Sequence, residues 1–127
     1  MTQSVETSVP PDAVVAVLAD ARHLPTWAPG FVDAVTGDAG SEWVGTKGDQ
    51  RFAIRVPVDP SAGTVDYLRE ISPGREGGAY LRAVPRPGSG TVIVMTLPIL
   101  PGTDQAATAA ILTEELSALA SLIEQTT

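Results

Sequence analysis

The residues of this sequence with the clearest potential for chemistry are Asp66, Tyr80 and Arg82, which fall in neighbouring apolar segments. Counting outward from the turns between these segments places Asp66 beside Arg82 on the more apolar face of a sheet. A carboxylate whose pKa is raised by burial can act as a general base, and a guanidinium or a phenol can stabilise an oxyanion. We therefore predict Asp66 as the acid–base residue, assisted by Arg82 or Tyr80. The alternatives are a structural ion pair or two residues on an exposed face.

His23 is the single histidine, and it lies in the Pro- and Gly-containing segment 22–31, which we expect to border a cavity mouth. An imidazole titrates near neutral pH, so His23 is a second catalytic candidate, with a solvated loop histidine as the alternative. Trp27 in the same segment either seats a short helix on the sheet or stacks on a ligand. Trp43 falls on the opposite face, where an exposed tryptophan would indicate a contact in a possible homodimer.

Counting residues outward from the turns also assigns the apolar neighbours of Asp66 to a face of the sheet. The count supposes that Val58 pairs near Thr64, and one β-bulge would move the side chains of a strand to the opposite face. The apolar side chains assigned to the same face are Phe52, Ile54, Val56, Val58, Leu68, Val84, Val92 and Val94. From this face and the helices that cover it, we predict ligand contacts by Trp27, Phe52, Ile54, Tyr80, Val94 and Leu116.

A long helix at 103–125 is the element that must cover this face. Leu112, Leu116, Leu119 and Ile123 repeat at spacings of four, three and four, which form one stripe of a helix. Thr103 or Asp104 can cap its first turn. The glutamates at 114, 115 and 124 are assigned to its solvent side.

The remaining elements follow from turn chemistry and periodicity. Residues 2–9 predict a strand, Pro11 begins a helix that ends near Asp20, and a short helix follows at 24–28. Apolar runs then lie at 31–36, 42–47, 50–58, 64–70, 79–85 and 91–98, separated by turns such as 37–40, 59–63 and 72–74. The short links favour antiparallel pairing. The predicted fold is α+β: one domain over 1–127, with a curved antiparallel sheet of six to seven strands wrapped around the long helix and two short helices after the first strand.

Composition excludes several classes of function. The net charge is −7 and Lys47 is the only lysine, so a nucleic-acid partner is not expected. Without cysteine and with one histidine, neither a metal site nor a disulfide is predicted, and no motif calls for a cofactor. No apolar run reaches the length of a membrane span, and no secretory signal is seen, so we expect a cytoplasmic protein without a membrane span.

The order of these elements resembles that of the START-like superfamily, also called SRPBCC or helix-grip. The residues that carry the resemblance are the segment from Val9 to Val15, Leu24-Pro25-Thr26-Trp27, Gly63 to Tyr67, and Leu81 to Pro85 with the later Leu100-Pro101-Gly102. They are most similar to a bacterial subgroup described as polyketide cyclase/dehydrase-like. The resemblance implies a cavity between the sheet and the C-terminal helix, and binding of a hydrophobic or aromatic small molecule there.

Two main functions, and a weaker third, are compatible with this sequence. In the first, the cavity only binds a hydrophobic molecule for transport, storage or sensing. In the second, the same cavity catalyses acid–base cyclisation or dehydration of a polyketide-like carbonyl compound. The scarcity of titratable residues predicted to face inward favours binding, whereas the resemblance to cyclases favours catalysis. The third is a domain that binds a partner through the outer face of the sheet.

Overall fold

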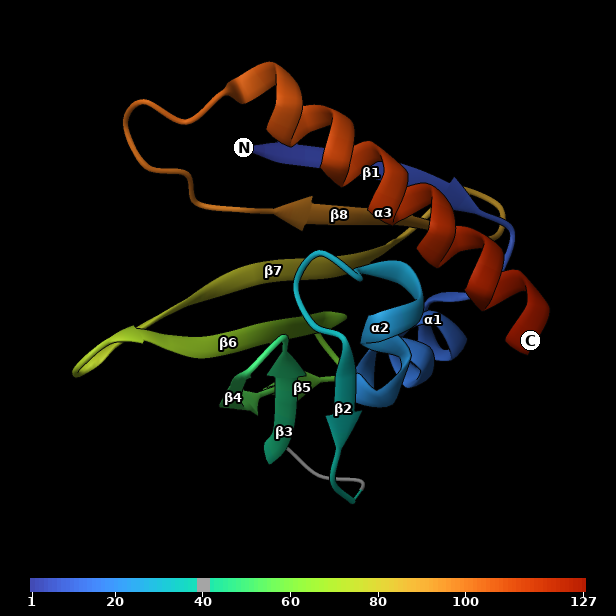
Figure 1. The fold of residues 1–127 in the computed structure, drawn as a ribbon. Coiled ribbons are helices and arrows are strands. Elements are labelled where there is room, and N and C mark those ends of the chain that lie inside the picture. Colours follow the sequence, from blue (N-terminus) through green and yellow to red (C-terminus); the bar gives the residue numbers. More distant parts are fainter. Residues whose placement is uncertain (39–41) are drawn as a thin grey trace.

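The structure, a computed structural model, describes residues 1–38 and 42–127, and shows the expected order of strands and helices (Figure 1). The first part contains β1 (Thr2–Thr7), α1 (Pro11–Ala19), the 3-10 turn η1 (Ala21–His23) and α2 (Leu24–Trp27). The strands that follow are β2 (Ala34–Thr36), β3 (Glu42–Lys47), β4 (Gln50–Arg55), β5 (Val58–Asp59), β6 (Thr64–Ser72), β7 (Arg75–Pro85) and β8 (Thr91–Thr96). The chain ends with α3 (Gln105–Thr126).

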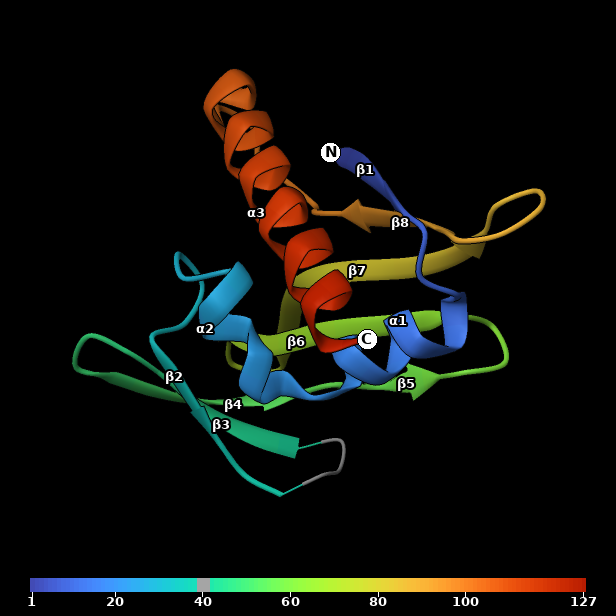
Figure 2. The ribbon, with the colours of Figure 1, turned by 90° about the vertical axis from the view of Figure 1, so that its right-hand side faces the viewer.

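The strands described form one antiparallel sheet in the order β1-β8-β7-β6-β4-β3-β2, with β5 paired to β6. Its eight strands exceed the predicted six to seven because the segment 50–58 divides into β4 and β5. The helices α1, α2 and α3 lie on the same side of this sheet, and α3 crosses it diagonally (Figure 2). The predicted helix-grip architecture is therefore confirmed.

The long helix α3 forms where the apolar stripe predicts it. Its start is capped by Asp104, whose Oδ1 accepts a hydrogen bond from the Ala107 amide at 3.0 Å. Leu116, Leu119 and Ile123 are each at most 1% exposed and pack into the core. By length and a mean hydropathy of 1.4, α3 would also meet the criteria for a membrane span. In this fold its apolar stripe is instead covered by the sheet and by α1 and α2.

The short helices α1 and α2 also begin at the predicted signals. Pro11 occupies the first turn of α1, where its missing N–H costs nothing. Trp27 closes α2, is 2% exposed, and lies with its ring centroid 5.7 Å from that of Tyr67 on the sheet. The Tyr67 hydroxyl donates a hydrogen bond of 2.6 Å to the carbonyl oxygen of Leu18. These two contacts fix the helical segment against β6.

The predicted register between the 50–58 and 64–70 segments is wrong by one residue. Thr64 pairs with Asp59, not with Val58. The reason is local, because Asp59 Oδ1 accepts hydrogen bonds from the amides of Ser61 at 3.1 Å and Ala62 at 3.2 Å. This tightens the turn and keeps Asp59 in the strand. A one-residue slip moves each side chain of β6 to the other face of the sheet.

The hairpin between β6 and β7 is tighter than predicted. Ser72 pairs with Arg75 across Pro73 and Gly74, and Gly74 has a φ of 75°, as the third position of a type II turn requires. A β-bulge between Glu70 and Ser72 shifts the pairing by one further residue, so Asp66 lies opposite Tyr80 and Arg82 lies opposite Thr64. In the next pairing, Arg82 lies opposite Val94 in β8. Paired residues have their side chains on the same face of the sheet. The wrong face predicted for the β6 side chains therefore also gives the wrong face for their partners in β7 and β8.

Trp43 is buried rather than exposed. Its side chain is 2% exposed, its strand partner is Ile54, and the Arg22 guanidinium lies 5.8 Å from its ring centroid. The argument that linked an exposed Trp43 to a homodimer therefore loses its basis, and the homodimer stays a prediction. The predicted turn at 37–40 lies partly outside the described residues.

Candidate functional site

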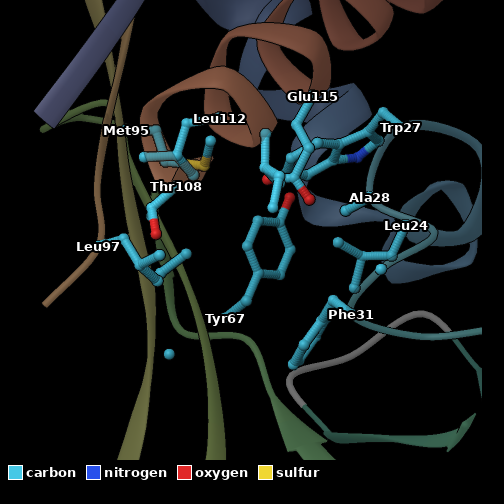
Figure 3. A pocket seen from close by; sticks show the side chains of 14 residues that line it. Leu24, Trp27, Ala28, Phe31, Tyr67, Met95, Leu97, Thr108, Leu112 and Glu115 are labelled. Atoms are coloured by element: carbon cyan, nitrogen blue, oxygen red, sulfur yellow. The ribbon is translucent and has the colours of Figure 1, made fainter. Parts of the chain in front are cut away.

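A cavity of about 320 Å³ lies between the sheet and the N-terminal half of α3 (Figure 3). Its volume falls within the range of small-molecule sites. Its walls come from α2 and the loop after it, from β6, β7 and β8, and from α3. The lining residues are Leu24, Trp27, Ala28, Gly30, Phe31, Tyr67, Gly78, Ala79, Met95, Leu97, Thr108, Ile111, Leu112 and Glu115.

The roof of the cavity is one stripe of α3. Thr108, Ile111, Leu112 and Glu115 follow the spacing i, i+3, i+4, i+7, so they share one face of the helix. The buried Leu116, Leu119 and Ile123 continue this stripe toward the C-terminus, where they contribute to the core. The helix therefore has an N-terminal half that covers the cavity and a C-terminal half that is anchored in the core.

The floor of the cavity is the inner face of the sheet. Tyr67 lies opposite Ala79 in the β6–β7 pairing, and Leu81 lies opposite Met95 in the β7–β8 pairing. Cross-strand partners and alternate residues share a face, so these side chains point to the same side. The small side chain of Ala79 leaves room that a larger residue would fill.

The cavity contains few polar side chains. The Tyr67 hydroxyl already donates to Leu18, and the Thr108 hydroxyl donates to the Asp104 carbonyl at 2.9 Å within α3. Burial raises the pKa of Tyr67 further, so its phenol remains neutral. No Lys, Arg or His is among the lining residues. Glu115 is therefore the one carboxyl group of a largely apolar cavity.

Glu115 is half-buried and points from α3 into the cavity, above the Tyr67 ring (Figure 3). Burial among apolar side chains raises its pKa from the usual 4.5 to about 7, and no charged neighbour opposes this shift. The assignment of Glu115 to the solvent side of the helix was wrong. Its spacing from Thr108 and Leu112 could have revealed its position, because these three residues lie on one stripe.

The raised pKa of Glu115 predicts a specific dependence of stability on pH. Between pH 4.5 and about 7 the folded protein holds this proton and the unfolded chain does not, so the free energy of unfolding falls as the pH rises. Between pH 5 and pH 8 the wild type should lose about 1–3 kcal/mol more stability than Glu115→Gln, which has no titrating group at this position. This magnitude takes into account that Glu115 is only partly buried. Urea unfolding of both proteins at each pH measures the difference. Parallel stability curves would contradict the prediction.

A second hollow of about 450 Å³ adjoins the cavity on the side of α2 and α3. Trp27, Gly30, Ile111 and Glu115 line both spaces. Ile111 is 54% exposed, which is unusual for an isoleucine on this stripe. The shared residues identify the gap between α2 and α3 as the connection from the cavity to solvent.

A larger hollow of about 580 Å³ lies elsewhere, between β3, β4, β6 and β7. Its rim carries the exposed ion pair between Arg55 and Glu76, with an N–O distance of 2.7 Å. Phe52 and Ile54, both predicted to contact a ligand, line this hollow and not the cavity under α3. Despite its greater volume, we do not choose it as the site, because its rim consists largely of charged and exposed residues.

The predicted inward orientation of Asp66, Tyr80, Arg82 and Val94 is wrong. The one-residue slip places them on the outer face of the sheet, while Val65, Tyr67 and Leu81 point into the core. No ion pair between Asp66 and Arg82 is present in the described structure, although partial burial raises the pKa of Asp66 against the opposing charge of Arg55. The roles predicted for these residues have no place at this cavity.

The other predicted site residues divide between the cavity and the core. Trp27 lines the cavity, as expected of a ligand contact. Leu116 is 1% exposed and belongs to the core below the cavity. His23 is partly exposed in η1 and is not among the lining residues. Within residues 1–38 and 42–127, no group of three or more His, Cys, Asp or Glu side chains is placed to hold a metal ion.

Similar structures support the architecture. A START superfamily protein from Mycobacterium smegmatis aligns with a TM-score of 0.70 at 16% identity, covering 100% of this chain and 98% of that one. The Zhui aromatase/cyclase from Streptomyces sp. R1128 aligns with a TM-score of 0.66 at 17% identity, covering 98% and 93%. A protein from Thermobifida fusca aligns with a TM-score of 0.67 at 25% identity, again covering 98% and 93%. These likenesses establish the fold.

Among curated proteins, no sequence matches this chain. The family described as polyketide cyclase / dehydrase and lipid transport matches residues 1–124, nearly the whole length. With the sheet, the covering helix and the cavity in place, this match shows that the chain belongs to the polyketide cyclase/dehydrase and lipid-transport family.

Proposed function

We propose that this protein reversibly binds a hydrophobic small molecule in the cavity beneath the N-terminal half of α3. The observation that carries the proposal is an apolar space of about 320 Å³ with a single carboxyl group in its lining. Trp27 and Phe31 would contact the ligand from one wall and Met95 from the other. Burial of apolar surface would supply the affinity. Cytoplasmic location remains a prediction from the sequence.

Uptake of the neutral dye N-phenyl-1-naphthylamine tests this proposal. Ala79→Phe should weaken dye binding at least tenfold, because the added ring would occupy the cavity from its floor. Val84→Phe is the matched control, since Val84 lies on the outer face of the same strand and is 38% exposed. We expect this control to bind the dye within about twofold of the wild type, because surface changes have small effects.

Circular dichroism on both variants should confirm that they are folded. If Ala79→Phe is folded and binds the dye as tightly as Val84→Phe, the dye binds elsewhere and the proposed site is incorrect. A wild-type protein that takes up no dye would likewise contradict the proposal.

A second candidate function is acid–base catalysis in the same cavity, with Glu115 in the role that the sequence assigned to Asp66. The specific observation in its favour is a half-buried carboxyl group with a pKa raised to about 7, near the optimum for general acid–base catalysis. Glu115→Gln separates the two functions. It should abolish turnover of an enzyme substrate, whereas a binding protein should still take up the neutral dye.

A further inference from the structure

Glu115 is the polar group that a molecule in this cavity would meet. It lies on the same helical face as Ile111 and Leu112, and Trp27 lines the cavity beside it. Of the lining side chains, two donate hydrogen bonds elsewhere, Tyr67 to the Leu18 carbonyl and Thr108 to the Asp104 carbonyl. The donor left for a ligand is the O–H of the protonated Glu115 carboxyl group. It pairs with an acceptor atom on the ligand.

The surroundings of Glu115 offer no positive charge. The loop after α2 contributes Ala28, Gly30 and Phe31, and β8 contributes Met95, none of which titrates. From β6 the titratable group is the neutral Tyr67, and on α3 itself it is the acidic Glu114, which lines the adjoining hollow. Nothing in the lining would therefore neutralise an ionised Glu115 or an anionic ligand beside it.

On the basis of the proposed function, we propose that Glu115 selects ligands bearing an uncharged hydrogen-bond acceptor, such as a ketone oxygen, and rejects carboxylate amphiphiles. A neutral acid holding a neutral oxygen buries no charge. An anionic ligand would place a second negative charge beside this carboxyl group in a protein of net charge −7. An amine would require both charges of an ion pair to be desolvated between apolar walls.

The size of the cavity sets the length of the probe. A volume of about 320 Å³ corresponds to an alkyl chain of roughly ten methylene groups, taking the 30 Å³ that a water molecule occupies in the liquid as the volume of one such group. The flat, fused rings of the dye occupy less volume per atom than an alkyl chain. 2-Decanone matches this size, and undecane has nearly the same shape without the oxygen. Decanoate and decylamine place a negative or a positive charge at the same end.

Displacement of N-phenyl-1-naphthylamine by these four probes at pH 5.5 and 8.5 tests the proposal. At pH 5.5 the ratio of 2-decanone affinity to undecane affinity should be about tenfold higher in the wild type than in Glu115→Leu, the size of effect that one hydrogen bond provides, because the cost of removing each ligand from water is the same for both proteins. At pH 8.5 this preference should shrink severalfold as Glu115 ionises, and decanoate should bind at least tenfold more weakly than the ketone. Glu115→Gln keeps a donor and should show the ketone preference at both pH values.

Glu114→Gln is the matched control, because it removes the neighbouring exposed carboxylate and should leave the wild-type pH dependence intact. The same ratio of 2-decanone affinity to undecane affinity in the wild type and in Glu115→Leu at both pH values would overturn the role of Glu115 while leaving the proposed cavity function in place. Tightest binding of decylamine would also overturn it. Failure of the dye and of all four probes to bind would refute the proposed function and this inference together.

Discussion

Gly78→Ala should lower the free energy of unfolding by about 3 kcal/mol or more, a loss typical of a severe packing defect. An added Cβ would collide with the backbone carbonyl group of Tyr67. This Cβ would lie 2.8 Å from the carbonyl carbon of Tyr67 and 3.1 Å from the Cα of Leu68. Backbone atoms cannot rotate away as side chains can, so the β6–β7 pairing would have to separate. Thermal and urea unfolding followed by circular dichroism would measure the loss.

Gly77→Ala is the control one position earlier on the same strand. Its added Cβ would meet only the side chain of Ile71, at 3.2 Å, and that side chain is 61% exposed and free to move. We expect its stability to change by no more than about 1 kcal/mol. If both glycine variants were equally stable, the close approach of the two strands at Gly78 would be refuted.

Leu116→Ala should destabilise the protein by about 2–5 kcal/mol, as expected for a fully buried leucine. Leu116 is 1% exposed on the core half of α3, so its truncation leaves a void that neighbouring side chains fill incompletely. Ile111→Ala provides the comparison on the cavity half of the helix. Because Ile111 is 54% exposed, we expect that change to cost about 1 kcal/mol or less.

The two helix variants should also differ in ligand binding. Ile111 lines both the cavity and the adjoining hollow, so Ile111→Ala should change the affinity for the dye more than the stability of the protein. A large loss of stability in Ile111→Ala, or none in Leu116→Ala, would show that the two halves of α3 do not divide in this way.

The order of the elements could be predicted from the sequence because its signals are local. The Leu112-to-Ile123 stripe and the Asp104 cap define α3, and Pro11 marks the start of α1. Each of these signals acts within a few residues of chain. The superfamily resemblance added the arrangement of helix on sheet, which no local signal contains.

The site could not be predicted to the same extent, because the face of the sheet on which a side chain lies depends on the strand register. The side-chain hydrogen bonds of Asp59 move one turn by a single residue, and this moves Asp66 and Arg82 to the outer face. Glu115 was missed for a different reason. A glutamate is normally solvated, and only the cavity wall opposite reveals that its position on the stripe is enclosed.

The division of α3 into two halves has an evolutionary consequence. Leu116, Leu119 and Ile123 maintain folding, while Thr108, Ile111 and Glu115 face the space that a ligand would fill. Substitutions in the N-terminal half can therefore change the ligand specificity without weakening the core contacts that hold the helix on the sheet. A mutational library confined to these three positions should yield mostly folded proteins. Ligand specificity could then change through one half of the helix while the other half preserves the fold.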